Sequence, residues 1–187
     1  MINQTLQEYN RVIRACKDIF IKKTTDYGTA WRILRLPSIT DQIFIKAQRI
    51  RSIQEKGVQK VDEDITSEFV GIINYCVIAL MQMKLLQQQV DAMEIPATEV
   101  EAAYNLEIEK NIELLLNKNH DYGEAWRDMR ISSITDIILM KLYRTKQIED
   151  NQGQTLISEG VEANYRDMIN YAVFVLIKLN FGLNETH

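Results

Sequence analysis

Apolar residues recur at helical spacing along several long stretches of the chain. In the stretch 62–87 they follow one another every three or four positions, as Ile65, Phe69, Ile72, Cys76, Ala79 and Met83. This period places them on one face of an α-helix that covers a hydrophobic core. The chain shows no strand-like alternation bounded by hairpin signals, and it contains only two prolines and seven glycines. The pattern therefore predicts an all-α fold.

The chain contains one helical unit twice. Residues 23–53 align with residues 118–148 at an offset of 95, with 16 of 31 positions identical, and from Gly57 and Gly153 onward the offset is 96. The matching motifs are Asp26-Tyr27-Gly28 with Asp121-Tyr122-Gly123, Ser38-Ile39-Thr40-Asp41 with Ser133-Ile134-Thr135-Asp136, and Asn74-Tyr75 with Asn170-Tyr171. This is a tandem repeat. We expect two related bundles, residues 1–92 and 98–187, packed as one globular unit about an approximate two-fold axis.

Each half predicts the same series of elements. A first helix (5–23 or 98–118) leads to the Asp-Tyr-Gly turn and to a short helical piece around the tryptophan, followed by a second long helix and a third (62–87 or 159–179). Capping residues predict where helices begin. Ser38 and Ser133 are expected to open the second helices, Asp26 to cap the short piece, and Thr98 with Glu101 to form a capping box.

Composition excludes several classes of protein. Apolar residues make up 46% and charged residues 26%, as in an ordinary soluble domain, and the net charge of −4 argues against a dominant nucleic-acid surface. Cys16 and Cys76 fit no zinc or redox pattern, so we expect a reducing, cytoplasmic compartment. The first residues lack the core of a signal peptide, and the longest apolar stretch, 69–81, is too short to span a bilayer. We therefore expect no membrane segment.

Acidic residues gather on the third helix of the second half. Glu159, Asp167 and Asn170 are predicted to share one helix face. Carboxylates on a bundle helix are typical ligands of Mg²⁺, although an acidic residue such as Glu159 is also common in a helix's first turn. Asp167 has apolar neighbours in the sequence, so its carboxylate needs a partner or a cation.

Basic and amide residues recur in both halves. Lys46 with Arg49, and Lys141 with Arg144, form i,i+3 pairs that could clamp a phosphate, although solvated surface charge is the alternative.

Asn74 and Asn170 lie in mid-helix, where an unpaired amide would cost about 1–3 kcal/mol. Each is expected to bond either a ligand or another helix. Trp31 and Trp126 are expected to anchor the core, with stacking on a base as the alternative.

These motifs resemble a known family. The succession Lys-x-x-Asp-Tyr-Gly-x-x-Trp, then Lys-x-x-Arg, then Glu followed by Asp-x-x-Asn-Tyr is similar to the nucleotide modification associated domain 1 family, once per half. The resemblance implies an all-helical protein linked by context to nucleotide metabolism. The motifs are also similar in style to all-α nucleoside triphosphate pyrophosphohydrolases of the MazG and dimeric dUTPase type, which use Mg²⁺ held by helix carboxylates.

The chain departs from the family pattern at several acidic positions. Ile45 and Met140 stand where an Asp precedes the Lys of Lys-x-x-Arg. In the third helix, the first half keeps Glu63 but has Ser67 and Gly71. The second half keeps Glu159 and Asp167 but has Ala163. Either the two halves jointly build one site, or catalysis has been lost.

The leading hypothesis is a nucleotide-handling protein with one composite site between the halves. Glu159 and Asp167 are the candidate catalytic residues, and Glu63, Glu159 and Asp167 are the candidate Mg²⁺ ligands. The candidate ligand-binding residues are Lys46, Arg49, Asn74, Lys141, Arg144, Asn170, Asp121 and Tyr122. The reaction would be metal-assisted hydrolysis of a phosphoanhydride.

The competing hypothesis is a non-catalytic helical scaffold, which Gly71 favours because a glycine within a helix brings no advantage unless close packing requires it. A nucleotide partner and a homodimer are further expectations.

Overall fold

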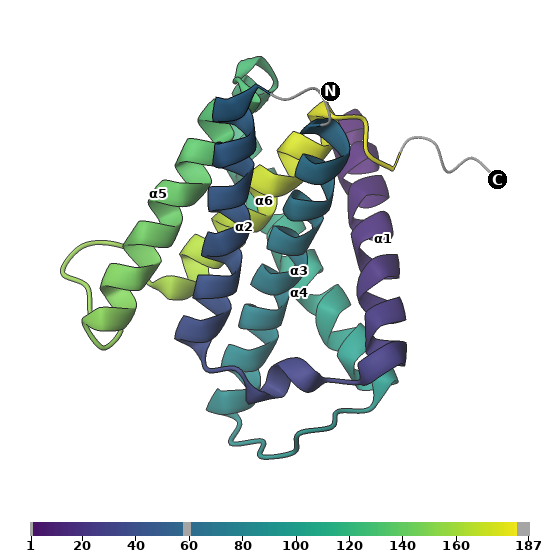
Figure 1. Ribbon diagram of the computed structural model, residues 1–187, viewed down its shortest axis with the longest axis vertical. Helices are drawn as coiled ribbons and strands as arrows, with labels where there is room; N and C mark the ends of the chain where they lie inside the picture. The colour runs from purple at the N-terminus through teal and green to yellow at the C-terminus, as the bar shows by residue number, and fades with distance from the viewer. Residues whose placement is uncertain (1, 58–60, 183–187) are drawn as a thin grey trace.

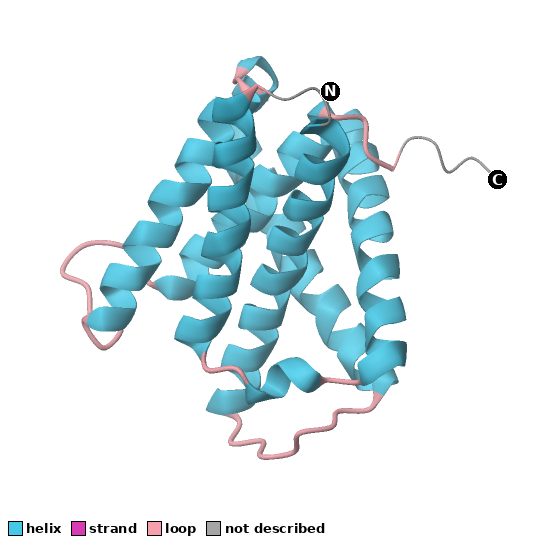
Figure 2. Ribbon diagram, in the orientation of Figure 1, coloured by secondary structure: helices cyan, strands magenta, loops and turns pink. Residues whose placement is uncertain are grey.

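The computed structural model describes residues 2–57 and 61–182, with only the backbone of 61–64, and all of its regular secondary structure is helical. The elements in chain order are α1 (Ile2–Tyr27), η1 (Ala30–Ile33), α2 (Leu36–Lys56), α3 (Val61–Gln87), α4 (Ala97–Tyr122), η2 (Ala125–Asp128), α5 (Ile131–Asp150) and α6 (Val161–Lys178). Figure 2 shows helices joined by loops, and no strand occurs in the described residues. The predicted all-α fold is confirmed.

The helix boundaries differ from the expected capping pattern. Asp26 lies inside α1, which continues to Tyr27 and ends because Gly28 adopts a left-handed φ of 64° that other residues rarely take. The predicted capping role of Asp26 is therefore wrong. Gly123 ends α4 in the same way, with a φ of 63°.

The predicted N-terminal caps are also wrong. Arg35 and Arg130 are the N-cap residues of α2 and α5, which places Ser38 and Ser133 inside the first turns. Pro96 holds the corresponding position before α4, so Thr98 is already helical. None of these three N-caps makes a side-chain hydrogen bond, because neither arginine nor proline has a side-chain acceptor for the N–H groups of the first turn.

The two halves pack as a two-fold pair. Each helix of the first half contacts its own counterpart, α1 with α4, α2 with α5 and α3 with α6, and the crossed contacts of α1 with α6 and of α4 with α3 are also present. Figure 1 shows α5, α2, α3 and α1 side by side, with α6 and α4 behind them. Reciprocal contacts of this kind are the geometry of an isologous interface, here within one chain. The apolar helix faces of each half are covered by the other half in one shared core, and the homodimer stays a prediction.

A reciprocal pair of buried hydrogen bonds joins the halves. The hydroxyl of Tyr9 on α1 donates to Oδ1 of Asn170 on α6 at 2.7 Å. The hydroxyl of Tyr104 on α4 donates to Oδ1 of Asn74 on α3 at 2.8 Å. Both asparagines therefore bond another helix, which was one of the two alternatives left open by the sequence.

The apolar helix α3 lies at the centre of the fold. By length and composition alone, its stretch Ile65–Gln87 passes as a membrane span, contrary to our expectation of none. Of this apolar segment, however, 67% is buried against the rest of the protein. A soluble protein's core helix has the same properties.

Candidate functional site

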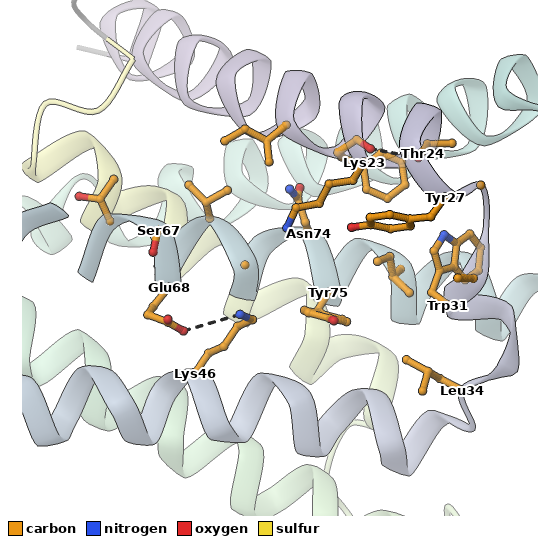
Figure 3. A pocket seen from close by; sticks show the side chains of 18 of the residues that line it. Lys23, Thr24, Tyr27, Trp31, Leu34, Lys46, Ser67, Glu68, Asn74 and Tyr75 are labelled. Atoms are coloured by element: carbon orange, nitrogen blue, oxygen red, sulfur yellow. Dashed lines mark hydrogen bonds and ion pairs between the residues drawn. The ribbon is translucent and has the colours of Figure 1, made fainter. Parts of the chain in front are cut away.

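The first half encloses a cavity of about 750 Å³ between α1, η1, α2 and α3. Its described lining comes from the first half, except for Phe181, which follows α6. In Figure 3 the side chains of α1 and α2 enter this cavity from opposite walls, and α3 forms the wall between them. A cavity of this size is typical of a small-molecule site.

Two lysines face this cavity, Lys23 from α1 and Lys46 from α2. Nζ of Lys46 lies 3.7 Å from Oε2 of Glu68, an ion pair longer than a hydrogen bond. The other oxygen of Glu68 accepts a hydrogen bond from Arg49 at 2.5 Å. Because Arg49 is the closer cation to Glu68, the Lys46 ammonium is the group better placed to meet an added anion.

Aromatic side chains line the same cavity. Tyr27, Trp31 and Tyr75 contribute to its walls, and Trp31 lies at the η1 end, away from Lys46 and Glu68 (Figure 3). Nε1 of Trp31 is buried and has no hydrogen-bond partner among the described residues. Since the indole N–H can only donate, a ligand with an acceptor at this point would satisfy it. The cavity therefore combines cations with aromatic surface and a donor.

The equivalent cavity of the second half is smaller, at about 200 Å³. Its walls come from α4, η2 and α6, with Lys118, Trp126, Asp167 and Phe174 among the lining residues. The rings of Trp126 and Phe174 stack with their centroids 4.4 Å apart and an interplanar angle of 6°. Phe174 thus covers the face of the tryptophan inside this cavity.

Asp167 is bound by two lysines. Its Oδ1 accepts a hydrogen bond from Lys118 at 2.6 Å, and its Oδ2 accepts one from Lys141 at 2.8 Å. Burial lowers the pKa of Lys118, but the hydrogen bond to Asp167 and the charges of Asp167 and Glu159 outweigh it, so that this pKa is raised. Asp167 therefore has the partner that its apolar surroundings require, and the partner is a pair of ammonium groups.

The predicted magnesium ligands Asp167 and Glu159 both act on Lys118, but the described residues do not gather them into a metal-binding group. Glu159 is exposed and precedes α6, so its expected position on that helix is wrong. The side chain of Glu63 lies outside the described residues. Among the described residues there is no group of three or more His, Cys, Asp or Glu side chains that could hold a metal. The described side chains do not fit a Mg²⁺ centre, and the catalytic roles of Glu159 and Asp167 stay predictions.

The remaining predicted ligand-binding residues fall into two groups. Asn74 borders the first cavity, and Asn170 and Tyr122 border the second. Arg144 and Asp121 are exposed on α5 and at the end of α4. Because each cavity is lined almost entirely by one half, the residues do not form the single composite site that we expected between the halves.

Lys23, Tyr27 and Tyr75 are cavity residues that are not among the predicted site residues, and Trp31 was expected to anchor the core. A signal was present, because Lys23 and Tyr27 stand at fixed positions in the repeated Lys-x-x-Asp-Tyr-Gly motif and Tyr75 in the repeated Asn-Tyr motif. The repeat reveals which residues recur, but not which of them face a cavity.

Comparison with known proteins agrees with the repeat. The family model described as nucleotide modification associated domain 1 matches residues 23–83 and again residues 118–179. The curated proteins and the solved structures gave no match. The two matched segments together span more than half of the chain and contain both cavities' lysines and tryptophans. The chain belongs to the nucleotide modification associated domain 1 family and contains its domain twice.

Proposed function

We propose that the protein binds a nucleotide in the cavity of the first half. The observation that supports this proposal is the presence, in one 750 Å³ cavity, of two lysines and a tryptophan whose N–H has no partner among the described residues. A nucleotide has the complementary groups, namely an anionic phosphate and a flat base that carries hydrogen-bond acceptors.

The phosphate would lie between Lys23 and Lys46. These residues enter the cavity from opposite walls (Figure 3), and an anion between them would face both ammonium groups. Hydrogen bonds between charged groups contribute about 1.5–3 kcal/mol each. Removing either lysine should therefore weaken binding by about ten-fold or more.

The base would lie against the aromatic side chains at the other end of the cavity. Stacking of a base on an aromatic side chain contributes about 1–3 kcal/mol. Tyr27 is 57% exposed, so a base that packs on it would also remove apolar surface from water. The indole N–H of Trp31 would donate to an acceptor on the base.

Binding is favoured over hydrolysis by the residues of the cavity. Glu68 is the only Asp or Glu among the described lining residues, and it already pairs with Arg49 and Lys46. A magnesium-dependent pyrophosphohydrolase needs several carboxylates around its metal. Pyrophosphohydrolase activity and Mg²⁺ therefore stay predictions, to be tested by adding Mg²⁺ to the same titrations.

Calorimetric titration of the full chain tests the proposal. Nucleoside mono-, di- and triphosphates are titrated in the presence and absence of Mg²⁺, and at least one is expected to bind. Lys23→Ala and Lys46→Ala should weaken that binding, whereas Lys22→Ala should not. Lys22 is the matched control because it is a neighbouring exposed lysine of α1 that pairs with Asp18. No heat with any nucleotide would favour the scaffold hypothesis instead, and an equal loss in all three variants would refute the placement of the nucleotide between Lys23 and Lys46.

Fluorescence locates the base. The chain has two tryptophans, so Trp126→Phe leaves Trp31 as the sole reporter. A nucleotide should change the emission of this variant, and inorganic phosphate should change it less. An emission unchanged by a nucleotide that binds would refute the placement of the base at Trp31.

A further inference from the structure

The two cavities have the same basic and aromatic framework. At the repeat offsets of 95 and 96, two lysines, a tryptophan and a tyrosine that line the first cavity match residues that line the second or, in the case of Lys141, contact its lining residue Asp167. The pairs are Lys23 with Lys118, Lys46 with Lys141, Trp31 with Trp126 and Tyr75 with Tyr171. The second cavity is nevertheless about a quarter as large, at about 200 Å³ against 750 Å³.

Two positions on the third helix differ in a way that fills space in the second cavity. Asp167 stands where the first half has Gly71, and Phe174 stands where it has Ile78. The Asp167 carboxylate lies between the two lysines of its half, at 2.6 and 2.8 Å, and the Phe174 ring stacks on the tryptophan at 4.4 Å. In the first half, Gly71 has no side chain that could pair with the lysines of the cavity, and Ile78 has no aromatic ring that could stack on Trp31.

Gly71 also sets the position of Lys46. A Cβ atom at this position would lie 2.7 Å from Cε and 2.8 Å from Cδ of Lys46, which is closer than packing allows. The aliphatic stem of Lys46 therefore occupies, in the first half, the space beside the third helix that matches the place of the Asp167 side chain in the second half. This is the close packing that explains a glycine in the middle of α3, where glycine is otherwise unfavourable.

We infer that Asp167 and Phe174 occupy, within the second cavity, the places that the anion and the aromatic ring of the ligand take in the first. The inference rests on the proposed nucleotide binding and deepens it. The first cavity is the ligand site, and the second is a copy filled by its own side chains. The chain thus binds one ligand, although it contains the domain twice.

The internal side chains also define the class of ligand. Asp167 and Phe174 are seven residues apart on α6, a separation of two turns or about 10 Å along the helix axis. A ligand that reaches both positions must have its anion and its flat ring at opposite ends. A nucleoside phosphate meets this requirement, whereas inorganic phosphate or a nucleoside alone reaches only one of them.

Exchange of the differing residues between the halves tests this inference. Gly71→Asp would place a carboxylate beside Lys46 and should abolish nucleotide binding. Gly71→Ala adds the Cβ atom without the charge, and its loss of binding should be smaller because the flexible end of Lys46 can move. The double variant Asp167→Gly with Phe174→Ile should raise the calorimetric stoichiometry from one nucleotide per chain to two. Circular dichroism checks that each variant folds.

The outcomes separate this inference from the proposed function. If the unmodified protein binds no nucleotide, the proposed function itself fails. If it binds one nucleotide that Lys46→Ala weakens, but Gly71→Asp binds as tightly as the unmodified protein, only the present inference is refuted. A folded double variant that still binds one nucleotide also refutes it. If the double variant does not fold, Gly71→Asp and Gly71→Ala decide the question alone.

Discussion

The reciprocal tyrosine–asparagine bonds between the halves give a matched pair of substitutions with unequal effects. Tyr9→Phe and Tyr104→Phe each remove one hydroxyl from a fully buried ring and leave the apolar ring in place. After Tyr9→Phe, Oδ1 of Asn170 still has Nδ2 of Asn111 at 3.3 Å. After Tyr104→Phe, Oδ1 of Asn74 loses the donor that it has at 2.8 Å.

The magnitudes follow from this difference. A hydrogen bond whose acceptor keeps another donor contributes about 1 kcal/mol or less to stability, whereas a buried polar atom left without a partner costs about 1–3 kcal/mol. Tyr104→Phe should therefore lower the free energy of unfolding more than Tyr9→Phe, by about 1 kcal/mol. Because the buried apolar area is unchanged, the denaturant dependence of unfolding should be the same in both variants.

Urea denaturation followed by circular dichroism measures both values. The comparison is internal, because the two tyrosines occupy equivalent positions of the repeat. An equal loss in the two variants, or a larger loss for Tyr9→Phe, would refute the reasoning that the asparagine environments decide the cost.

Two further predictions concern stability. Arg32 donates from Nε and Nη2 to two backbone carbonyls of the connection between α3 and α4, at 3.0 and 2.5 Å, so Arg32→Met should destabilise the fold by about 2–3 kcal/mol in urea denaturation. An unchanged midpoint would contradict this role. Burial, assisted by nearby carboxylates, raises the pKa of Glu149 above its ordinary value, so its ionised form opposes folding as the pH rises through that pKa. Glu149→Gln should raise the melting temperature at pH 7 by up to about 3 °C but not near pH 4, and an equal gain at both pH values would refute the titration.

The helices and the duplication could be predicted from the sequence. Helical periodicity and the self-alignment are properties of residues close in the chain or of whole segments, so both are visible without coordinates. The ends of the helices were less predictable. Ser38 and Asp26 are favourable capping residues by type. The boundaries are set instead by Gly28, which ends α1, and by the extended backbone of Arg35, which precedes α2.

Residue type also predicted that Asp167 and the two asparagines must be paired, because a buried polar group without a partner is costly. It could not identify the partners. Asp167 meets Lys118 and Lys141, from two other helices, and Asn74 meets Tyr104 of the opposite half. Such pairings join residues 26 to 49 positions apart, and only the packing of the helices decides them.

Only the tertiary structure determines whether each cavity is open or filled by its own side chains. From the sequence, Gly71 is interpreted as the loss of an acidic residue, which favours a scaffold. Asp167 is interpreted as a metal ligand. In the fold, Lys46 fills the space above Gly71 and two lysines surround Asp167. Whether a side chain fills a cavity or lines it depends on what three or four helices place around it. That arrangement is a property of the packed core, which no local pattern of residues encodes.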